Sequence, residues 1–103
     1  MSEDYKRPED CRDMIDVRRG VDATDRELMA LLDRRFSYMR AAARIKQERV
    51  SVRDEARKAA VIAAARADAV SRNMPGAAIE NLWNCLVEAS IAYEFEEWDR
   101  LRQ

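Results

Sequence analysis

The sequence predicts an all-α fold with three helices in each subunit, and three observations support this prediction. The 103 residues include two glycines and two prolines, so the chain has few places to turn. Nearly all other residues are good or tolerable helix formers. Apolar side chains recur at alternating intervals of three and four over the first half of the chain, as in long amphipathic helices. We therefore expect one small helical domain that covers residues 1–103.

The first helix is predicted to run from about residue 9 to about residue 47, with Pro8 and Glu9 at its start. Arg35 interrupts its heptad seam, which otherwise carries Met14, Val17, Val21, Thr24, Leu28, Leu31, Tyr38, Ala42 and Ile45. Such a helix measures about 58 Å, whereas a compact domain of this size has a radius of gyration of about 13 Å. The rest of the chain is too short to cover it, so we expect an intertwined homodimer.

The remaining residues predict a loop, a break and two further helices. Residues 47–52 lose the apolar pattern and are expected to form a loop that can move. Residues 53–72 predict an alanine-rich second helix, whose small side chains allow close approach of its neighbours. Residues 73–76 read Asn-Met-Pro-Gly and interrupt the chain before a third helix at about 77–101. This third helix has a broad apolar face formed by Ile79, Leu82, Trp83, Leu86, Val87, Ile91, Phe95 and Trp98.

The composition argues against several classes of function. The chain has 19 Lys and Arg against 20 Asp and Glu, and its net charge of −1 gives no general electrostatic footprint for nucleic acid. It has no His, and Cys11 and Cys85 are its only thiols, so we expect no metal site and no His-dependent catalytic triad. The widely spaced thiols, and residues 1–6 without the apolar core of a signal peptide, predict a reduced, cytoplasmic protein. No apolar run approaches the roughly 18 residues of a membrane span, so we expect no membrane contact.

Charged and polar residues also occur where the pattern favours apolar ones. Arg35 lies within the seam, and Lys46 follows 11 residues later, close to three helical turns. Both cations therefore project from nearly the same face and can converge on one small dianion. Ser90 and Glu94, spaced i, i+4 on the third helix, are expected to point toward the interior. A desolvated Glu94 would pair with a cation such as Arg35 or Lys46, or would stay protonated and donate a hydrogen bond.

The same residues allow a purely structural interpretation. Arg35 and Glu94 can form a buried ion pair, as happens in the interiors of helical bundles. Lys46 can cap the end of its helix, and Ser90 can fill a small gap in the core. The pattern alone thus predicts a dimeric helical bundle with a candidate interior anion site.

Five short motifs, at spacings that need no insertions, extend over nearly the whole chain. They are Asp16-Val17-Arg18, Leu31-Leu32-Asp33-Arg34-Arg35, Lys46, Val52-Arg53-Asp54 with Arg57, and Ser90 with Glu94. In these motifs the chain resembles the all-helical chorismate mutase family. The resemblance implies an intertwined dimer in which the first helix of the other subunit completes each active site. This agrees with the 28 residues between Arg18 and Lys46, about 42 Å along one helix, which no small ligand can span.

The resemblance also implies a set of substrate-binding residues, which are Arg18, Arg35, Lys46, Asp54, Arg57, Ser90 and Glu94. Arg18 of the partner subunit and Arg35 would bind the two carboxylates of chorismate. Lys46 would donate a hydrogen bond to its ether oxygen, and Glu94 would face that oxygen from the opposite side. Catalysis would therefore rest on Arg35, Lys46 and Glu94.

Three further residues have implied roles around the same substrate. Arg57 would add positive charge from the second helix, Ser90 would lie near a substrate carboxylate, and the backbone near Asp54 would lie beside the ring hydroxyl. The implied reaction is a pericyclic rearrangement that needs no cofactor, metal, nucleophile or general base. It needs a compact substrate conformer and fixed positive charge where negative charge develops on the ether oxygen.

Two residues depart from the pattern of the family. Many mutases carry Gln where this chain has Glu94, and an ionised carboxylate there would repel the developing negative charge. We therefore predict that Glu94 acts in its protonated form. Lys58 stands where many mutases carry a Glu that contacts the ring hydroxyl.

The leading functional prediction is chorismate mutase, which forms prephenate for aromatic amino-acid biosynthesis or specialised metabolism. The main alternative is isochorismate-pyruvate lyase, which releases pyruvate and leaves salicylate, because residues 8–11, 40–46 and 91–98 resemble the lyase branch of this fold. A mutase acting on an amino analogue of chorismate is a further alternative. A non-catalytic dimerisation or regulatory module is the contrasting class.

Overall fold

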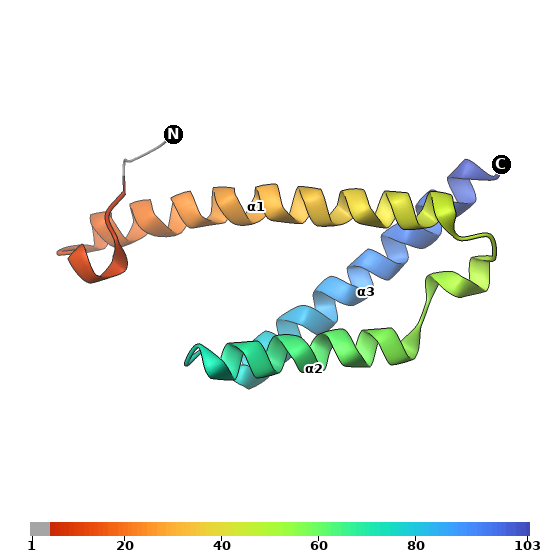
Figure 1. Cartoon of the computed structure of the whole chain (residues 1–103). Coiled ribbons are helices and arrows are strands. Elements are labelled where there is room, and N and C mark those ends of the chain that lie inside the picture. The colour runs from red at the N-terminus through yellow and green to blue at the C-terminus, as the bar shows by residue number, and fades with distance from the viewer. Residues whose placement is uncertain (1–4) are drawn as a thin grey trace. The chain divides into compact units, whose positions relative to one another are not determined.

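The computed structural model describes residues 5–103, and every regular element in them is a helix (Figure 1). The α-helices are α1 (Met14–Ile45), α2 (Glu55–Ser71) and α3 (Gly76–Leu101), and two short 3-10 helices are η1 (Pro8–Asp10) and η2 (Arg49–Val52). The all-α prediction with a very long first helix is confirmed. Within residues 5–103, no helix is both long enough and apolar enough to cross a membrane. The first four residues of the segment that we examined for a signal peptide lie outside the described residues.

Helix α1 begins five residues later than its apolar pattern predicts. Pro8 starts η1 instead of the long helix, and the backbone is already extended at Cys11. Asp13 explains the later start, because its Oδ1 accepts a hydrogen bond of 2.8 Å from the backbone N–H of Asp16. A side-chain acceptor at this position satisfies one of the unpaired N–H groups in the first turn and fixes where the helix begins.

The connection between α1 and α2 is more regular than the predicted mobile loop. Residues 49–52 form η2, and Val52 is buried, with 3% of its surface exposed. Asp54 then caps α2, since its side chain accepts a hydrogen bond from the backbone N–H of Arg57. The capped start explains why α2 begins at Glu55, two residues after the predicted boundary.

The break between α2 and α3 lies where the sequence places it. Asn73 has a φ of 62°, in the left-handed region that asparagine tolerates better than most residues. Pro75 precedes the first residue of α3, Gly76, in an extended conformation. A Cβ at position 76 would lie 3.0 Å from the Val70 side chain, so glycine permits the close approach of the α2 end.

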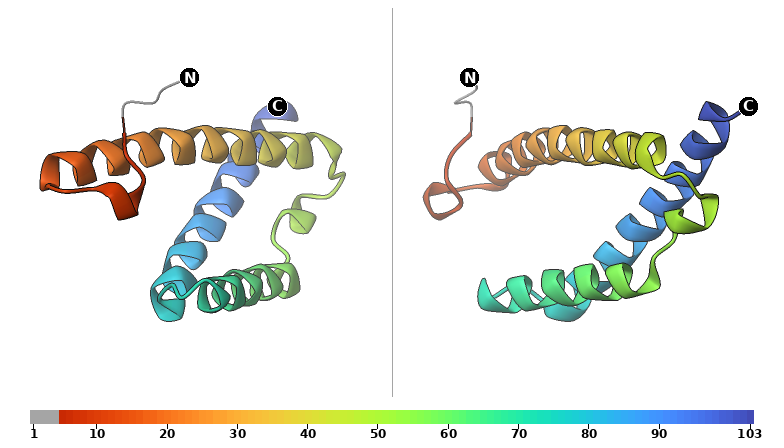
Figure 2. Two further views of the ribbon diagram at one scale, coloured as in Figure 1. Left: turned by 60° about the vertical axis from the view of Figure 1, so that its left-hand side comes forward. Right: turned by 45° about the vertical axis from the view of Figure 1, so that its right-hand side comes forward.

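Contacts within the chain divide it into two compact units, with the boundary inside α1 between Phe36 and Ser37. In the second unit, α3 turns back along α2 (Figure 2). Its core contains Val52, Val87 and Ile91, packed against the partly buried side chains of Val61, Ile62, Trp83, Phe95 and Trp98. Burial of these aliphatic and aromatic groups is the main stabilising contribution within the unit.

In the first unit, the seam of α1 is open to solvent. Met14, Val21, Leu28 and Leu31 are 50–54% exposed, although they belong to the apolar seam. A row of exposed apolar side chains over four helical turns is unusual on a monomer and is typical of a helix that packs against another protein surface.

Candidate functional site

The polar interior of the second unit is formed by Lys46 and Glu94. Lys46 follows the last residue of α1, and its Nζ lies 2.8 Å from Oε2 of Glu94 on α3. The Glu94 side chain is 5% exposed and that of Lys46 is 30% exposed. The ammonium lies outside hydrogen-bonding geometry, so Glu94 Oε2 is a buried oxygen with no hydrogen-bond donor in residues 5–103. Lys46, one of the two cations that the sequence offers for Glu94, thus lies beside it.

Ser90 lies one turn before Glu94 on the buried face of α3, and 3% of its surface is exposed. Its hydroxyl donates a hydrogen bond of 2.7 Å to the carbonyl oxygen of Leu86, four residues earlier on the same helix. The prediction that Ser90 and Glu94 point to the interior is confirmed. Val87 and Ile91, on the adjoining part of this face, belong to the core, so the packing of α3 sets the direction of both polar side chains.

Two arginines hold η2 and the start of α2 against α3. Arg49 makes two hydrogen bonds, of 2.8 and 3.0 Å, to the carboxylate of Asp99, and its guanidinium lies 4.6 Å from the centre of the Phe95 ring. Arg53 makes two, of 2.8 and 3.1 Å, to the carboxylate of Glu88. Paired guanidinium–carboxylate bonds fix orientation as well as distance. With Val52 buried between them, these contacts hold η2 against α3.

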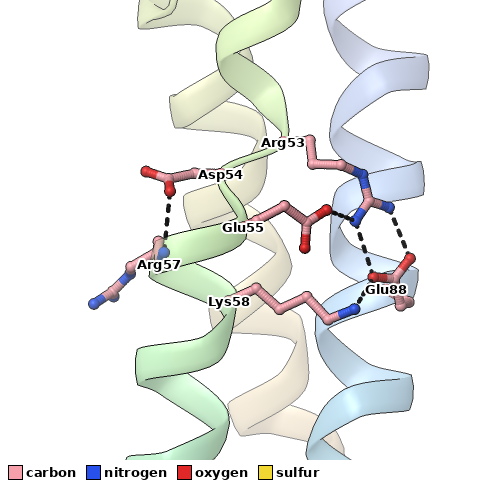
Figure 3. A network of polar contacts seen from close by, with 6 residues as sticks. All are labelled: Arg53, Asp54, Glu55, Arg57, Lys58 and Glu88. Atoms are coloured by element: carbon pink, nitrogen blue, oxygen red, sulfur yellow. Dashed lines mark hydrogen bonds and ion pairs between the residues drawn. The ribbon is translucent and has the colours of Figure 1, made fainter.

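Figure 3 shows how the polar side chains divide at the start of α2. Asp54 and Arg57 lie on one side, where Asp54 Oδ1 accepts a hydrogen bond of 3.0 Å from the Arg57 backbone. Lys58 points to the other side, where its Nζ binds Glu88. Arg53 also contacts Glu88, and these two cations lower the pKa of Glu88 to about 2, Arg53 having the larger effect.

The Lys58 ammonium therefore binds on a different part of α3 from the buried polar pair. Glu88 and Glu94 are six residues apart, which places them about 120° apart around the helix. Position 58 thus provides no carboxylate beside Ser90 and Glu94. Its charge is balanced by Glu88, and the Lys58 side chain is 22% exposed.

The first unit holds the other two predicted cations. Arg18 is exposed in the second turn of α1, and Arg35 is half-buried near the end of this unit. The structure thus brings Lys46, Ser90 and Glu94 together in one unit, with Asp54 and Arg57 at the start of α2. It describes Arg18 and Arg35 on a separate unit of the chain.

Several contacts that shape the site were not predicted from the sequence. Arg53 and Glu88 form one ion pair, and Trp98 and Arg102 contact the end of α1. No spacing rule links residues 35 to 59 positions apart, so these contacts could not be found without the fold. The one sequence feature that pointed to such a contact was Lys58, because a cation on a partly buried helix face needs a carboxylate partner.

The arrangement can bind a polar, anionic ligand beside a lysine ammonium and a buried carboxyl group. Such a site supplies fixed positive charge and a second polar group, which suits reactions that develop charge on an oxygen atom and need no nucleophile. A low local dielectric strengthens both interactions because water is excluded from the Glu94 side of the pair.

Comparison with known proteins agrees with this chemistry. The chain is 28% identical over 97 residues to an isochorismate pyruvate lyase from Pseudomonas aeruginosa, a match that spans 94% of this chain and 96% of the lyase. The family described as chorismate mutase type II matches residues 17–95, from the end of the first turn of α1 to the residue after Glu94. The chain therefore belongs to the type II chorismate mutase family, as its resemblance in sequence predicts.

Proposed function

We propose that this protein is an isochorismate-pyruvate lyase, which eliminates pyruvate from isochorismate and leaves salicylate. The observation that carries a pericyclic function of this kind is the Lys46–Glu94 pair, in which a partly exposed ammonium at the end of α1 meets a buried carboxyl group on α3. In the proposed reaction the Lys46 ammonium stabilises the ether oxygen as its bond to the ring breaks. The ring hydrogen then ends on the methylene carbon of the departing enolpyruvyl group, so no external base is required.

Two observations favour the lyase reaction over the mutase reaction that leads from sequence alone. The lyase relative matches over nearly the full length of both chains. Position 58 carries a lysine bound to Glu88 where many mutases present a carboxylate to the ring hydroxyl. Chorismate and isochorismate differ in where that hydroxyl sits on the ring, so the loss of this carboxylate weakens recognition of chorismate in particular.

Chorismate mutase is the second candidate, supported by the family match over residues 17–95. The two reactions share the ether oxygen, both carboxylates and the need for a compact substrate conformer. We assign the same site residues to either reaction, namely Arg18, Arg35, Lys46, Asp54, Arg57, Ser90 and Glu94.

The test is to incubate the purified protein separately with chorismate and isochorismate and to identify the products by chromatography and mass spectrometry. A higher kcat/KM for the conversion of isochorismate to salicylate and pyruvate than for the conversion of chorismate to prephenate supports the lyase. Prephenate formed with the higher kcat/KM makes the protein a mutase and leaves Lys58 an incidental replacement. If neither substrate reacts and a bicyclic dicarboxylate transition-state mimic at millimolar concentration does not raise the melting temperature, the protein is a non-catalytic module.

We also propose that the chain forms one domain of a homodimer in which each site receives Arg18 from the partner subunit. The exposed seam of α1 supports this arrangement, since Met14, Val21, Leu28 and Leu31 are left uncovered. A mixing experiment tests it. Arg18→Ala and Lys46→Ala are each expected to be inactive, but their mixed dimers contain one intact site. After unfolding and refolding together in equal amounts, the mixture should recover about a quarter of wild-type activity, because half of the dimers are mixed.

No recovery in the mixture would contradict sharing of the site, provided that each variant alone refolds to a dimer. A mixture of Lys46→Ala with Arg35→Ala is the matched control, because both residues are assigned to the same subunit of one site. It should stay inactive.

The two free thiols, Cys11 and Cys85, support a reducing location, and we propose that the protein works in the cytoplasm.

A further inference from the structure

The backbone of Lys46 is held by Trp98 on α3, the helix that carries Glu94, and by Arg102, the residue that follows the end of α3. The indole Nε1 of Trp98 donates a hydrogen bond of 3.0 Å to the Lys46 carbonyl oxygen. Arg102 Nη2 donates a second one, of 2.7 Å, to the same oxygen. Arg102 Nη1 donates to the carbonyl oxygen of Ala43 at 3.0 Å, and Ala43 is fully buried.

These contacts satisfy groups that a helix end leaves unpaired. The last four carbonyls of an α-helix have no partner within the helix, and terminal turns open more readily than central ones. The Arg102 guanidinium also lies 4.2 Å from the Trp98 ring, so the two donors support each other. Its positive charge is favourable at a helix C-terminus, where the helix dipole is negative.

The order of residues on α3 aligns the three contacts. Trp98 is four residues after Glu94 on α3, and Arg102, the residue that follows the end of α3, is eight residues after it, so the three lie within about 80° of one another around the helix. Lys46 is thereby fixed at two points. Glu94 meets its ammonium at 2.8 Å, and Trp98 and Arg102 meet its carbonyl oxygen.

We propose that Trp98 and Arg102 are positioning residues for Lys46 in the pericyclic reaction, an inference that rests on the proposed function. They hold the last turn of α1 at the distance from α3 at which the ammonium meets both Glu94 and the substrate's ether oxygen. A displacement of about 1 Å between reacting groups can cost roughly a hundredfold in rate. The loss should appear in kcat rather than KM, because charge on the ether oxygen develops only in the transition state.

The test uses Trp98→Phe and Arg102→Gln in the full-length protein. Trp98→Phe keeps a ring but removes the indole donor, and Arg102→Gln removes the charge and the forked donors. Each is expected to lower kcat by about tenfold with a smaller change in KM. Arg100→Gln is the matched control, because Arg100 lies on the same end of α3 and binds Glu97 rather than the end of α1. It should change kcat by less than about twofold.

A second measurement reports on Lys46 without any substrate. Lys6, Lys46 and Lys58 are the lysines of this chain, so reductive methylation followed by mass spectrometry can follow each one separately. In the wild type, Lys46 should react more slowly than Lys6, whose side chain is 52% exposed against 30% for Lys46. Trp98→Phe and Arg102→Gln should accelerate Lys46 several-fold and leave Lys6 unchanged.

The two measurements separate the possible outcomes. A lower kcat together with faster labelling of Lys46 supports the proposal. Variants that only melt at a lower temperature, with kcat and labelling unchanged well below melting, overturn it and make the contacts structural. If the wild type converts neither chorismate nor isochorismate, the proposed function fails, and the labelling alone decides whether Trp98 and Arg102 position Lys46.

Discussion

Lys46 Nζ lies 2.8 Å from Oε2 of Glu94, whose side chain is 5% exposed. The ammonium is thus the charged neighbour of a buried carboxyl group in the free protein. When the ether oxygen of a bound substrate accepts a hydrogen bond from this ammonium, the ammonium stabilises the negative charge of Glu94 less. A buried carboxylate without compensation is costly, so a proton on Glu94 would restore the balance. This connects the ion pair of the free protein with the protonated form that we predict for the catalysed reaction.

The first prediction concerns proton uptake on binding. We expect the wild type to take up about one proton per site when it binds a bicyclic dicarboxylate transition-state mimic, because Glu94 becomes protonated. Glu94→Gln, which is neutral and similar in size, should bind without proton uptake.

Calorimetric titrations in two buffers of different ionisation enthalpy measure the number of protons directly. Equal binding enthalpies in both buffers for the wild type would contradict the prediction. Glu96→Gln is a suitable control, since Glu96 is exposed on the same helix.

The second prediction separates the structural role of the ion pair from its catalytic role. Lys46→Met removes the charged neighbour of Glu94 and should destabilise the protein by roughly 1–3 kcal/mol, because the buried carboxyl group then has no positive charge beside it. The double variant Lys46→Met with Glu94→Gln should regain most of this stability and remain inactive.

Urea unfolding at one fixed protein concentration measures the free energy of unfolding, and product analysis measures turnover. Activity in the double variant would show that Lys46 is not catalytic. A Lys46→Met protein as stable as the wild type would show that the pair contributes nothing to folding.

The third prediction concerns Glu88, whose pKa is lowered from its ordinary value of 4.5 to about 2, mainly by hydrogen bonds from Arg53 and then from Lys58. A lowered pKa in the folded state means that the ionised group stabilises the fold above pH 4.5 and that this contribution disappears as the pH falls toward 2. Glu88→Gln should therefore melt at a lower temperature than the wild type at neutral pH.

The difference in melting temperature should shrink between pH 4.5 and 2, which circular dichroism can follow across a pH series. Glu80→Gln is the matched control, because Glu80 pairs with Arg66 across the same two helices with both side chains about half exposed. Exposed pairs contribute little, so this control should change the melting temperature less. If the difference in melting temperature between Glu88→Gln and the wild type stays constant down to pH 2, the pKa of Glu88 is not the cause of that difference.

Periodicity and local signals predicted the helices well, because each depends on residues that are close in sequence. The three-and-four spacing defined α1, and the segment Asn73 to Gly76 marked the break before α3. The start of α1 was missed because Pro8 also fits a short 3-10 turn, and the capping side chain of Asp13 decides between the two. Helix starts depend on one hydrogen bond, which an apolar pattern does not report.

The candidate site was predictable in part. The i, i+4 spacing placed Ser90 and Glu94 on one buried face, but it left open whether Arg35 or Lys46 meets Glu94. That choice depends on the contact between the end of α1 and α3, which is made by side chains far apart in the sequence, such as Trp98 with the Lys46 carbonyl. The 3-10 helix η2 was missed for the same reason, since it is held by the hydrogen bonds between Arg49 and Asp99, which are 50 residues apart.

The last prediction concerns the segment before α1, which is tied to the first turn of the helix. Lys6 Nζ lies 3.0 Å from Oδ2 of Asp16, and the backbone N–H of Arg12 donates to the same oxygen at 3.1 Å. The Arg12 hydrogen bond and then the Lys6 ammonium lower the pKa of Asp16 from its ordinary value. The ionised carboxylate therefore helps to hold the helix start at neutral pH, and this contribution is lost in acid.

Lys6→Ala and Asp16→Asn should loosen the first two turns of α1, where Arg18 lies, without unfolding the second unit. We expect faster trypsin cleavage after Arg18 in both variants at neutral pH, because proteolysis follows the population of locally opened helix. Arg7→Ala is the control from the same segment, since Arg7 pairs with Asp10 inside the segment rather than with α1. Cleavage after Arg18 at the wild-type rate in Lys6→Ala would show that Asp13 and Arg12 fix the helix start without Lys6.

If this segment also positions Arg18 for the partner subunit's site, Lys6→Ala should raise KM for the substrate and leave kcat nearly unchanged. The reason is that Arg18 is assigned to binding a carboxylate that is charged in both the ground state and the transition state.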